Sequence, residues 1–428
     1  MKFRVERDVL ADAVSWVARA LPTRPVVPVL SGLLLHAEGD GLQLSCFDYE
    51  VSARATVPAE VGGAGSALVP GRLLAEIARS LPVADVDVRT TADMVMLTCG
   101  SAEFGLVSLS QAEYPSLPEV PGVLGTVDGG LLATAAAQVV PAASRDDTLP
   151  MLTGVCLEFD GPTLTVAATD RYRMAVRRLP WEPTLPLAHR SVLVPARTLA
   201  DVARTMAPGK PVTIGVAQPA RDGAGAADGL ICFEGGGRRL TARLIGTEFI
   251  RYEARFPAGY AASAELPAGP FTEAVRRVSL VADRGAAVQL AFRRDMVVIE
   301  AQSDGRARAV ESVPVRLDGQ DQVLSFNPQY LLDGLTAATL TGSGAGSAVG
   351  HPADRIRLQF SGPARPALVT WLSGDGKAEP DPSGDEPAEG NGAGPVPVAS
   401  PAGGDLGDPG VQPAFRYLVV PLRGAAAH

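Results

Sequence analysis

The chain has 428 residues, of which 46% are hydrophobic and 20% charged, enough for two to four domains with packed cores. No apolar run reaches the roughly 18 residues of a membrane-spanning helix, and the N-terminal MKFRVERDVL lacks the apolar middle of a signal peptide, so a cytoplasmic protein is expected. The net charge is −9, but eight acids and one lysine between Asp375 and Asp408 account for −7 of it, so composition neither supports nor excludes a nucleic-acid partner.

One helical pattern recurs along the chain. GRLLAEIARSLP and ARTLADVARTM are nearly superimposable, each follows a Val-Pro pair, and their apolar residues fall at i, i+3, i+4 and i+7. This spacing is typical of a helix with one buried face. With its weaker copies the pattern predicts six short helices, which begin near Arg7, Gly71, Asp128, Ala196, Gly269 and Asn327.

Between the predicted helices, apolar and polar residues alternate. Examples are GLQLSCFDYEVSARATV, PTLTVAATDRYRMAVRRL and MVVIEAQSDGRARAVESV, which we interpret as paired strands joined by Gly, Asp or Ser turns. The sequence therefore predicts an α+β fold in which one short helix accompanies about four strands, repeated six times.

Arginines fall opposite the apolar stripe on several of these helices, at about 100° per residue. They are Arg72 and Arg79 on one helix, Arg197 and Arg204 at the same positions of another, and Arg19 and Arg276. A solvated polar face explains any single helix, but matching arginines on equivalent helices favour a shared basic surface. The helices near Asp128 and Asn327 carry no such arginines.

A segment of low complexity, residues 374–411, interrupts the C-terminal part. It is rich in Gly, Pro, Ala and acids, a composition that buries too little apolar area to offset its ordering entropy. We predict a disordered insert, dispensable for folding, between two paired strands, PALVTWLSG and FRYLVVPLRG. A charge-repelling or partner-binding loop is the alternative.

The residues that usually perform chemistry are scattered. No CxxC or HExxH occurs, and the four cysteines (Cys46, Cys99, Cys156 and Cys232) are predicted to be buried apolar side chains in a reducing compartment. We find no nucleophile elbow, phosphate loop or metal spacing, which argues against the rival interpretation, an enzyme with VAATDRYR as its catalytic loop. No metal or cofactor is expected.

The order of these segments resembles one family along nearly the whole chain. The segments RPVVPVLSGLLLHAEGDGLQLSCFDYE, VPGRLLAEIARSLP, LPMLTGVCLEFDGPTLTVAATDRYRMAV and LSFNPQYLLDGL are similar to the β subunit of bacterial DNA polymerase III, the β sliding clamp. The high Ala, Gly, Pro and Arg content is typical of GC-rich genomes such as those of actinobacteria.

The resemblance implies three similar clamp domains, residues 1–126, 127–256 and 257–428, each with two helix-plus-four-strand units. Helices would line the inside and antiparallel sheets the outside of a ring closed by a head-to-tail homodimer. Such a ring encircles double-stranded DNA without sequence preference and is a non-catalytic processivity factor in the cytoplasm, associated with the nucleoid. Its partners are the replicative polymerase α subunit, the clamp loader, other polymerases and repair proteins.

The resemblance also places two functional surfaces. Arg24 matches the family's RP loop and, with the helix arginines, gives the candidate DNA-binding set Arg24, Arg72, Arg79, Arg197, Arg204 and Arg276. Partners of the family dock through short linear motifs in an apolar pocket. Carried over by position, that pocket comprises Leu152, Thr169, Arg171, Tyr172, Arg173, Met174, Ile250, Asn327, Tyr330, Val419, Val420, Pro421, Leu422 and Arg423.

The sequence departs from the family pattern around this pocket. Ile250 stands where the family usually has proline, Glu253 and Ala254 replace basic or polar residues, and Arg171 replaces a small residue. These departures put the shape of the pocket in doubt. They leave open an alternative function, a specialised duplicate clamp whose altered pocket tolerates pocket-directed inhibitors.

Overall fold

The computed structural model describes residues 1–186, 189–206, 210–217, 229–283, 285–303, 305–340, 355–372 and 414–422. Two compact units are present, which we describe separately. Unit 1 comprises Met1–Gly129 and Arg204–Leu244, and unit 2 comprises Gly130–Ala203 and Ile245–His428. The predicted insert, residues 374–411, lies outside the described residues.

All six predicted helices are present, and they begin within a residue or so of the positions expected from the apolar spacing. They are α1 (Arg7–Val17), α2 (Gly71–Ser80), α3 (Gly129–Val139), α5 (Ala196–Thr205), α6 (Ala268–Ser279) and α7 (Pro328–Thr339). One four-residue helix, α4 (Pro150–Thr153), was not predicted. None of the helices in the described ranges combines the length and apolar character needed to cross a membrane.

Unit 1 is built on antiparallel strands in two sheets. One sheet has the order β5-β1-β7-β8-β9, and eight further strands follow one another in the order β10-β16-β17-β18-β4-β3-β2-β6. The strands are β1 (Lys2–Glu6), β2 (Gly32–Glu38), β3 (Gly41–Phe47), β4 (Val51–Pro58), β5 (Glu60–Gly63), β6 (Gly65–Pro70), β7 (Asp85–Thr90), β8 (Met94–Cys99), β9 (Ala102–Val107), β10 (Val123–Asp128), β16 (Pro211–Ala217), β17 (Leu230–Gly235) and β18 (Arg238–Arg243).

Unit 2 also has two antiparallel sheets, with orders β15-β11-β12-β13-β27-β26-β25-β19-β23 and β22-β21-β20-β24. Its strands are β11 (Gly154–Asp160), β12 (Thr163–Thr169), β13 (Arg173–Pro180), β14 (Glu182–Pro183), β15 (Arg190–Pro195), β19 (Ala262–Pro267), β20 (Val288–Phe292), β21 (Met296–Ser303), β22 (Ala307–Pro314), β23 (Arg316–Asp318), β24 (Gln322–Phe326), β25 (Arg355–Phe360), β26 (Ala367–Leu372) and β27 (Phe415–Val419).

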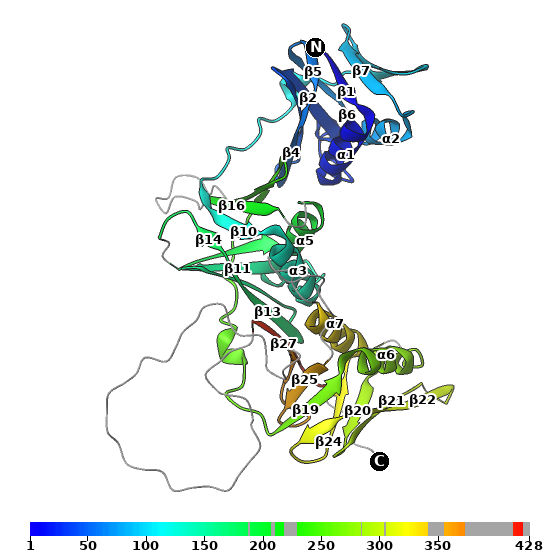
Figure 1. The fold of residues 1–428 in the computed structure, drawn as a ribbon, viewed down its shortest axis with the longest axis vertical. Helices are drawn as coiled ribbons and strands as arrows, with labels where there is room; N and C mark the ends of the chain where they lie inside the picture. Colours follow the sequence, from blue (N-terminus) through cyan, green and yellow to red (C-terminus); the bar gives the residue numbers. More distant parts are fainter. Residues whose placement is uncertain are drawn as a thin grey trace. The chain divides into compact units, whose positions relative to one another are not determined.

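Two pairs of helices pack on their sheets (Figure 1). In unit 1, α1 and α2 contact each other, with α1 against β3 and β4 and α2 against β6. In unit 2, α6 and α7 contact each other, with α6 against β20 to β22 and α7 against β25 to β27. The amphipathic pattern explains this arrangement, because Leu74, Ile77 and Ala78 of α2 are buried while Arg72 and Arg79 are exposed. Each fully buried leucine or isoleucine contributes about 2 kcal/mol.

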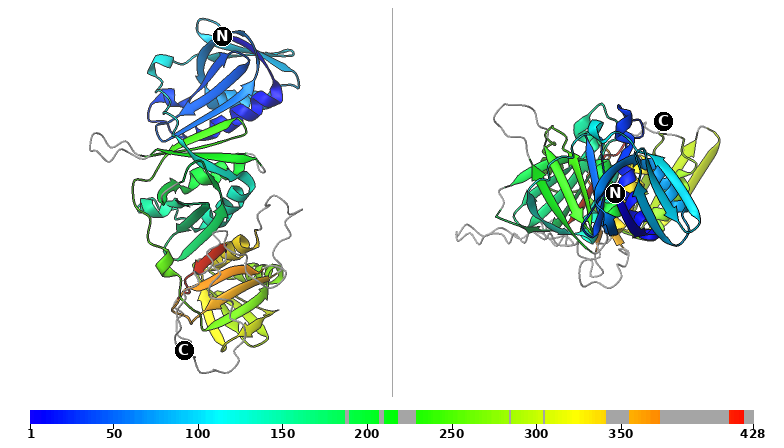
Figure 2. Two further views of the ribbon diagram at one scale, coloured as in Figure 1. Left: turned by 60° about the vertical axis from the view of Figure 1, so that its left-hand side comes forward. Right: turned by 90° about the horizontal axis from the view of Figure 1, so that it is seen from above.

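The two strands expected on either side of the insert do pair. β26 and β27 run antiparallel, with Leu368 opposite Leu418, and Figure 2 shows β27 (red) within the sheet. On its other side β27 pairs with β13, so one sheet continues from the 154–195 region into the C-terminal region. All four cysteines are free and buried, as predicted.

Candidate functional site

A tight turn between β12 and β13 carries four of the predicted pocket residues. Thr169 ends β12, and its hydroxyl donates to the carbonyl of Arg173 at 2.6 Å and accepts the backbone N–H of Arg171 at 3.1 Å. The carboxylate of Asp170 accepts the N–H groups of Tyr172 and Arg173, each at 3.0 Å. Short polar side chains that bond to the nearby backbone in this way fix the path of a turn. The TDRYR sequence therefore sets its own conformation.

Arg171 occupies the left-handed region, with φ of 80°. A side chain with a Cβ is disfavoured there by about 1 kcal/mol relative to glycine. The side chain of Arg171 is exposed. The hydrogen bond from its N–H to Thr169 helps to hold this strained backbone. The departure at Arg171 noted in the sequence thus places a large cationic side chain where the backbone favours glycine.

Arg173 ties this turn to α7. Its Nε donates to the carboxylate of Asp170 at 3.0 Å, and its Nη1 forms an ion pair with Asp333 of α7. The guanidinium lies over the ring of Tyr330, 4.4 Å from the ring centroid, and the Arg173 side chain is only 10% exposed. Burial lowers the pKa of Arg173, but the nearby Tyr417, Asp333 and Asp170 outweigh it and hold the pKa above its usual value. The arginine is therefore permanently charged and fully engaged within the protein.

The C-terminal strand runs alongside the turn. Arg173 and Met174 of β13 lie opposite Val419 and Leu418 of β27. Beyond β27 the backbone N–H of Val420 donates to the carbonyl of Tyr172 at 2.8 Å. These contacts bring Val419 and Val420 to the turn. Pro421 follows them, and the N–H of Leu422 donates to the carbonyl of Ser325 at 2.7 Å. Arg423 lies outside the described residues.

The beginning of α7 lies beside the turn and the end of β27, and we call these three segments together the rim. The side chain of Asn327 caps the helix by accepting the N–H groups of Gln329 at 2.9 Å and Tyr330 at 3.3 Å. The ring of Tyr330 stacks on that of Tyr172, with centroids 6.1 Å apart and planes 23° apart. Tyr172 is 51% exposed, so the pair presents an aromatic surface to solvent. The predicted residues from both ends of unit 2 therefore gather in one place.

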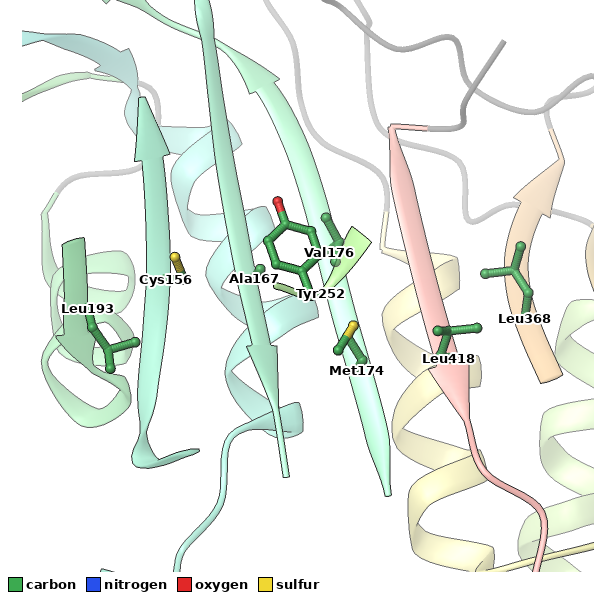
Figure 3. Packing of buried hydrophobic residues seen from close by; sticks show 8 residues of the cluster. All are labelled: Cys156, Ala167, Met174, Val176, Leu193, Tyr252, Leu368 and Leu418. Carbon is green, nitrogen blue, oxygen red and sulfur yellow. The ribbon is translucent and has the colours of Figure 1, made fainter. Parts of the chain in front are cut away.

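An apolar cluster lies on the sheet beside this rim (Figure 3). Its buried members come from β11, β12, β13, β15, β26, β27 and the segment after Ile245, and they are Cys156, Ala167, Met174, Val176, Leu193, Tyr252, Leu368 and Leu418. Ile250 is partly buried and packs against the cluster, as does Met151. Leu152, which the sequence singled out, is buried but is not a member. Met151, its neighbour, makes the contact.

Several residues that hold this site were not predicted from the sequence. Asp170 and Asp333 engage Arg173, and the hydroxyl of the buried Tyr252 donates to Glu158 at 2.5 Å. Burial and the Glu158 carboxylate together raise the pKa of Tyr252, so the tyrosine remains a donor. The sequence gives a signal for Asp170, because it is an acid within a predicted turn. It gives none for Asp333 and Tyr252, whose partners Arg173 and Glu158 lie 160 and 94 residues away.

The candidate DNA-binding arginines are all exposed. Arg72 Nη2 donates to the carbonyls of Leu21 at 3.1 Å and Pro22 at 3.3 Å, which anchors α2 to the loop that carries Arg24. Arg79 donates to the carbonyl of Ala75 one turn earlier. The remaining candidates are Arg197 and Arg204 on α5 and Arg276 on α6, the last of which is ion-paired with Glu273.

The residues gathered at this site form binding surfaces. Among the described residues, no three His, Cys, Asp or Glu side chains are placed to hold a metal ion. The four thiols are buried, and burial raises the pKa of Cys46 and of Cys156 to about 12. Such thiols are protonated at neutral pH and are poor nucleophiles.

Comparison with known proteins gives the family. Models of the N-terminal, central and C-terminal domains of the DNA polymerase III beta subunit match residues 1–118, 126–250 and 254–376. The chain belongs to this family. It is 46% identical to the beta sliding clamp of Streptomyces coelicolor, over 99% of each chain. It is 42% identical to GriR, a beta sliding clamp homolog of Streptomyces muensis, over 78% of this chain and 88% of GriR.

The fold agrees with that of solved members. The DNA polymerase III subunit beta from Pseudomonas aeruginosa is similar with a TM-score of 0.79 and 24% identity, over 99% of this chain and all of that one. The predicted α+β clamp fold is confirmed. The protein is a DNA sliding clamp, a non-catalytic processivity factor of DNA replication, and this confirms the function expected from the resemblance.

Proposed function

We propose that two copies of this chain close head to tail into a ring around double-stranded DNA, with three domains in each copy at residues 1–126, 127–256 and 257–428. The observation that carries the proposal is the repeated helix whose apolar stripe is buried and whose arginines are exposed, seen on α2, α5 and α6. In a protein that slides, exposed arginines supply positive charge for phosphate contacts, which carry no sequence information.

The DNA-facing set is Arg24, Arg72, Arg79, Arg197, Arg204 and Arg276. Arginine contacts to phosphates are independent of sequence and weaken with salt, so they guide the duplex without fixing it at one position. Arg72 and Arg79 are attached to backbone carbonyls, which directs them but leaves further N–H donors of each guanidinium for a phosphate. Retention on DNA then depends on closure of the ring.

Two edge strands support the head-to-tail contact. Within the described residues, β9 ends its sheet in unit 1 and β22 ends its sheet in unit 2. Edge strands present backbone N–H and C=O groups that can pair with another chain. Both edges also expose aliphatic side chains, with Val107 at 62% and Val310 at 48% exposure. A contact from β9 of one copy to β22 of the next uses different surfaces on the two copies, which is the arrangement that generates a ring.

The docking site for partners is the rim and apolar cluster of unit 2. An apolar surface beside a few polar anchors suits a short linear motif of modest affinity. Modest affinity allows the polymerase α subunit, the clamp loader, other polymerases and repair proteins to exchange, while tethering on DNA raises their effective concentration. In this proposal the exposed Tyr172 and Arg171 meet the motif together with the partly buried Tyr330, and Arg173 acts indirectly by positioning the turn.

The test is retention on DNA after loading by a clamp loader. We expect the protein to stay on nicked circular DNA and to leave when the circle is linearised, because a ring slides off a free end. A dimer-interface variant, Val107→Arg with Val310→Arg, should be monomeric and should leave both forms. Equal retention on circular and linear DNA would show ordinary affinity and overturn encirclement.

The specialised duplicate clamp remains a second proposal. It is motivated by the strained, cationic Arg171 and by Ile250 against the apolar cluster. The ordinary clamp is favoured, since the Streptomyces coelicolor clamp matches nearly the whole chain at higher identity than GriR does. Titration of a pocket-directed inhibitor against the parent and against Ile250→Pro with Arg171→Gly separates the two.

A further inference from the structure

Unit 1 contains a cavity of about 500 Å³, and its lining includes none of the motif-docking residues. Three separate parts of the chain line it. These are the exposed side of α1 and the turn after it, residues 55–57 of β4, and residues between Arg204 and Arg238. The volume falls within the roughly 300–1,000 Å³ typical of small-molecule sites.

Cations predominate among the charged residues that line the cavity. Arg19, Arg204, Lys210 and Arg238 contribute four positive charges, and Asp12 is the single acid among the lining residues. The formal charge of the lining is therefore +4 − 1 = +3. Positive charge concentrated in a concave surface raises the local concentration of anions. The lining thus favours an anionic ligand.

Arg238 is held in place within this cavity. Its Nη2 is ion-paired with Asp12, and its Nη1 donates to the carbonyl of Thr205 at 2.7 Å. The guanidinium also lies over the ring of Trp16, 5.5 Å from the centroid. A guanidinium that is already positioned loses little conformational freedom when it binds a ligand. The cavity is therefore preorganised on this side.

The turn before Arg238 shapes the same wall. Gly236 and Gly237 have φ of 60° and 76°, values that suit glycine, and the N–H of Thr56 donates to the carbonyl of Gly237 at 3.0 Å. A Cβ on Gly237 would lie 3.2 Å from the carbonyl oxygen of Thr56. The glycines thus let the turn between β17 and β18 lie close to β4, and this carries Arg238 to the cavity.

We propose that this cavity binds a phosphate-bearing ligand of about nucleotide size. Arginine and lysine side chains that converge on one volume are the usual donors to phosphate oxygens, through charge-assisted hydrogen bonds. The source that we propose is a free nucleotide, because contact with the phosphates of a DNA strand already belongs to the DNA-facing surface described above. The indole of Trp16, buried beneath Arg238, lies close enough to report binding.

The experiment follows tryptophan fluorescence of the full chain. Trp16 is in unit 1, whereas the other two tryptophans, Trp181 and Trp371, are in unit 2. Separate titrations use pyrophosphate, adenosine diphosphate and a short DNA duplex. We expect a saturable change that disappears in Trp16→Phe. Lys210→Ala and Arg19→Ala, both exposed positions, should weaken binding about tenfold or more.

The matched control is Arg89→Ala, which removes an exposed cation of β7 that does not line the cavity. Calorimetric titration of the same variants gives a second readout that does not depend on Trp16. Saturation by pyrophosphate or adenosine diphosphate supports the proposal, whereas a response to duplex alone reports only the DNA contact already proposed and overturns it. No response to any probe, or equal weakening by Arg89→Ala and Lys210→Ala, overturns the proposal.

Discussion

Replacing Arg173 by alanine should destabilise unit 2 more than any single change on its exposed surface. The side chains of Arg173, Asp170 and Asp333 are 10%, 11% and 23% exposed, so little water screens them. The variant leaves two carboxylates without their cation and removes the contact with Tyr330. It should also loosen the turn from α7, because Arg173 joins them.

The size of the effect follows from this burial. Breaking a buried ion pair typically costs about 3–5 kcal/mol, and the residual exposure of Asp333 favours the lower end. We therefore expect a loss of about 3 kcal/mol in the free energy of unfolding. With a dependence on urea of about 2–3 kcal/mol per molar, the midpoint should fall by about 1 M.

The assay is urea unfolding in a Trp16→Phe background, so that fluorescence reports Trp181 and Trp371 of unit 2. The control is Arg276→Ala, because its ion pair with Glu273 is about half exposed on both sides and should contribute no more than about 0.5 kcal/mol. A double-mutant cycle with Asp333→Ala isolates the pair itself. Equal midpoints for Arg173→Ala and Arg276→Ala would refute the reasoning.

Three further predictions test the turn, the helices and the docking site. Arg171→Gly should stabilise unit 2 by about 1 kcal/mol, because glycine accommodates the φ of 80°. Arg171→Ala, which keeps the strain, should not, and equal melting temperatures for the two variants would contradict this. Charge reversal at Arg197 and Arg204 should shorten retention on circular DNA, more so at low salt, where phosphate contacts contribute most, and leave the dimer mass unchanged. Unaltered retention would remove α5 from the DNA-facing surface. Ile250→Pro with Arg171→Gly should bind a pocket-directed inhibitor about ten-fold or more tighter than the parent, with little change for a polymerase motif peptide. Equal inhibitor affinity in both proteins would argue against an altered pocket.

The local sequence pattern was sufficient to predict the helices and the exposure of their arginines. The apolar spacing in GRLLAEIARSLP and ARTLADVARTM reflects the 3.6-residue period of the helix, which needs no knowledge of distant residues. The two strands on either side of the insert were also predictable. Their apolar and polar residues alternate, and the composition of the insert between them buries too little apolar area to pack. The four-residue helix α4 was missed because one turn carries no periodic signal.

The candidate docking site required the tertiary structure. Its members were named from the resemblance, but neither period nor spacing indicates that β13 pairs with β27 across more than 230 residues. The partners of Arg173 also come only from the tertiary structure, which pairs it with Asp170 and Asp333. The cavity beside Trp16 likewise gathers three separate segments. Helix periodicity is a property of neighbouring residues, whereas strand register, ion pairs across 160 residues and cavities depend on which surfaces the folded chain brings together.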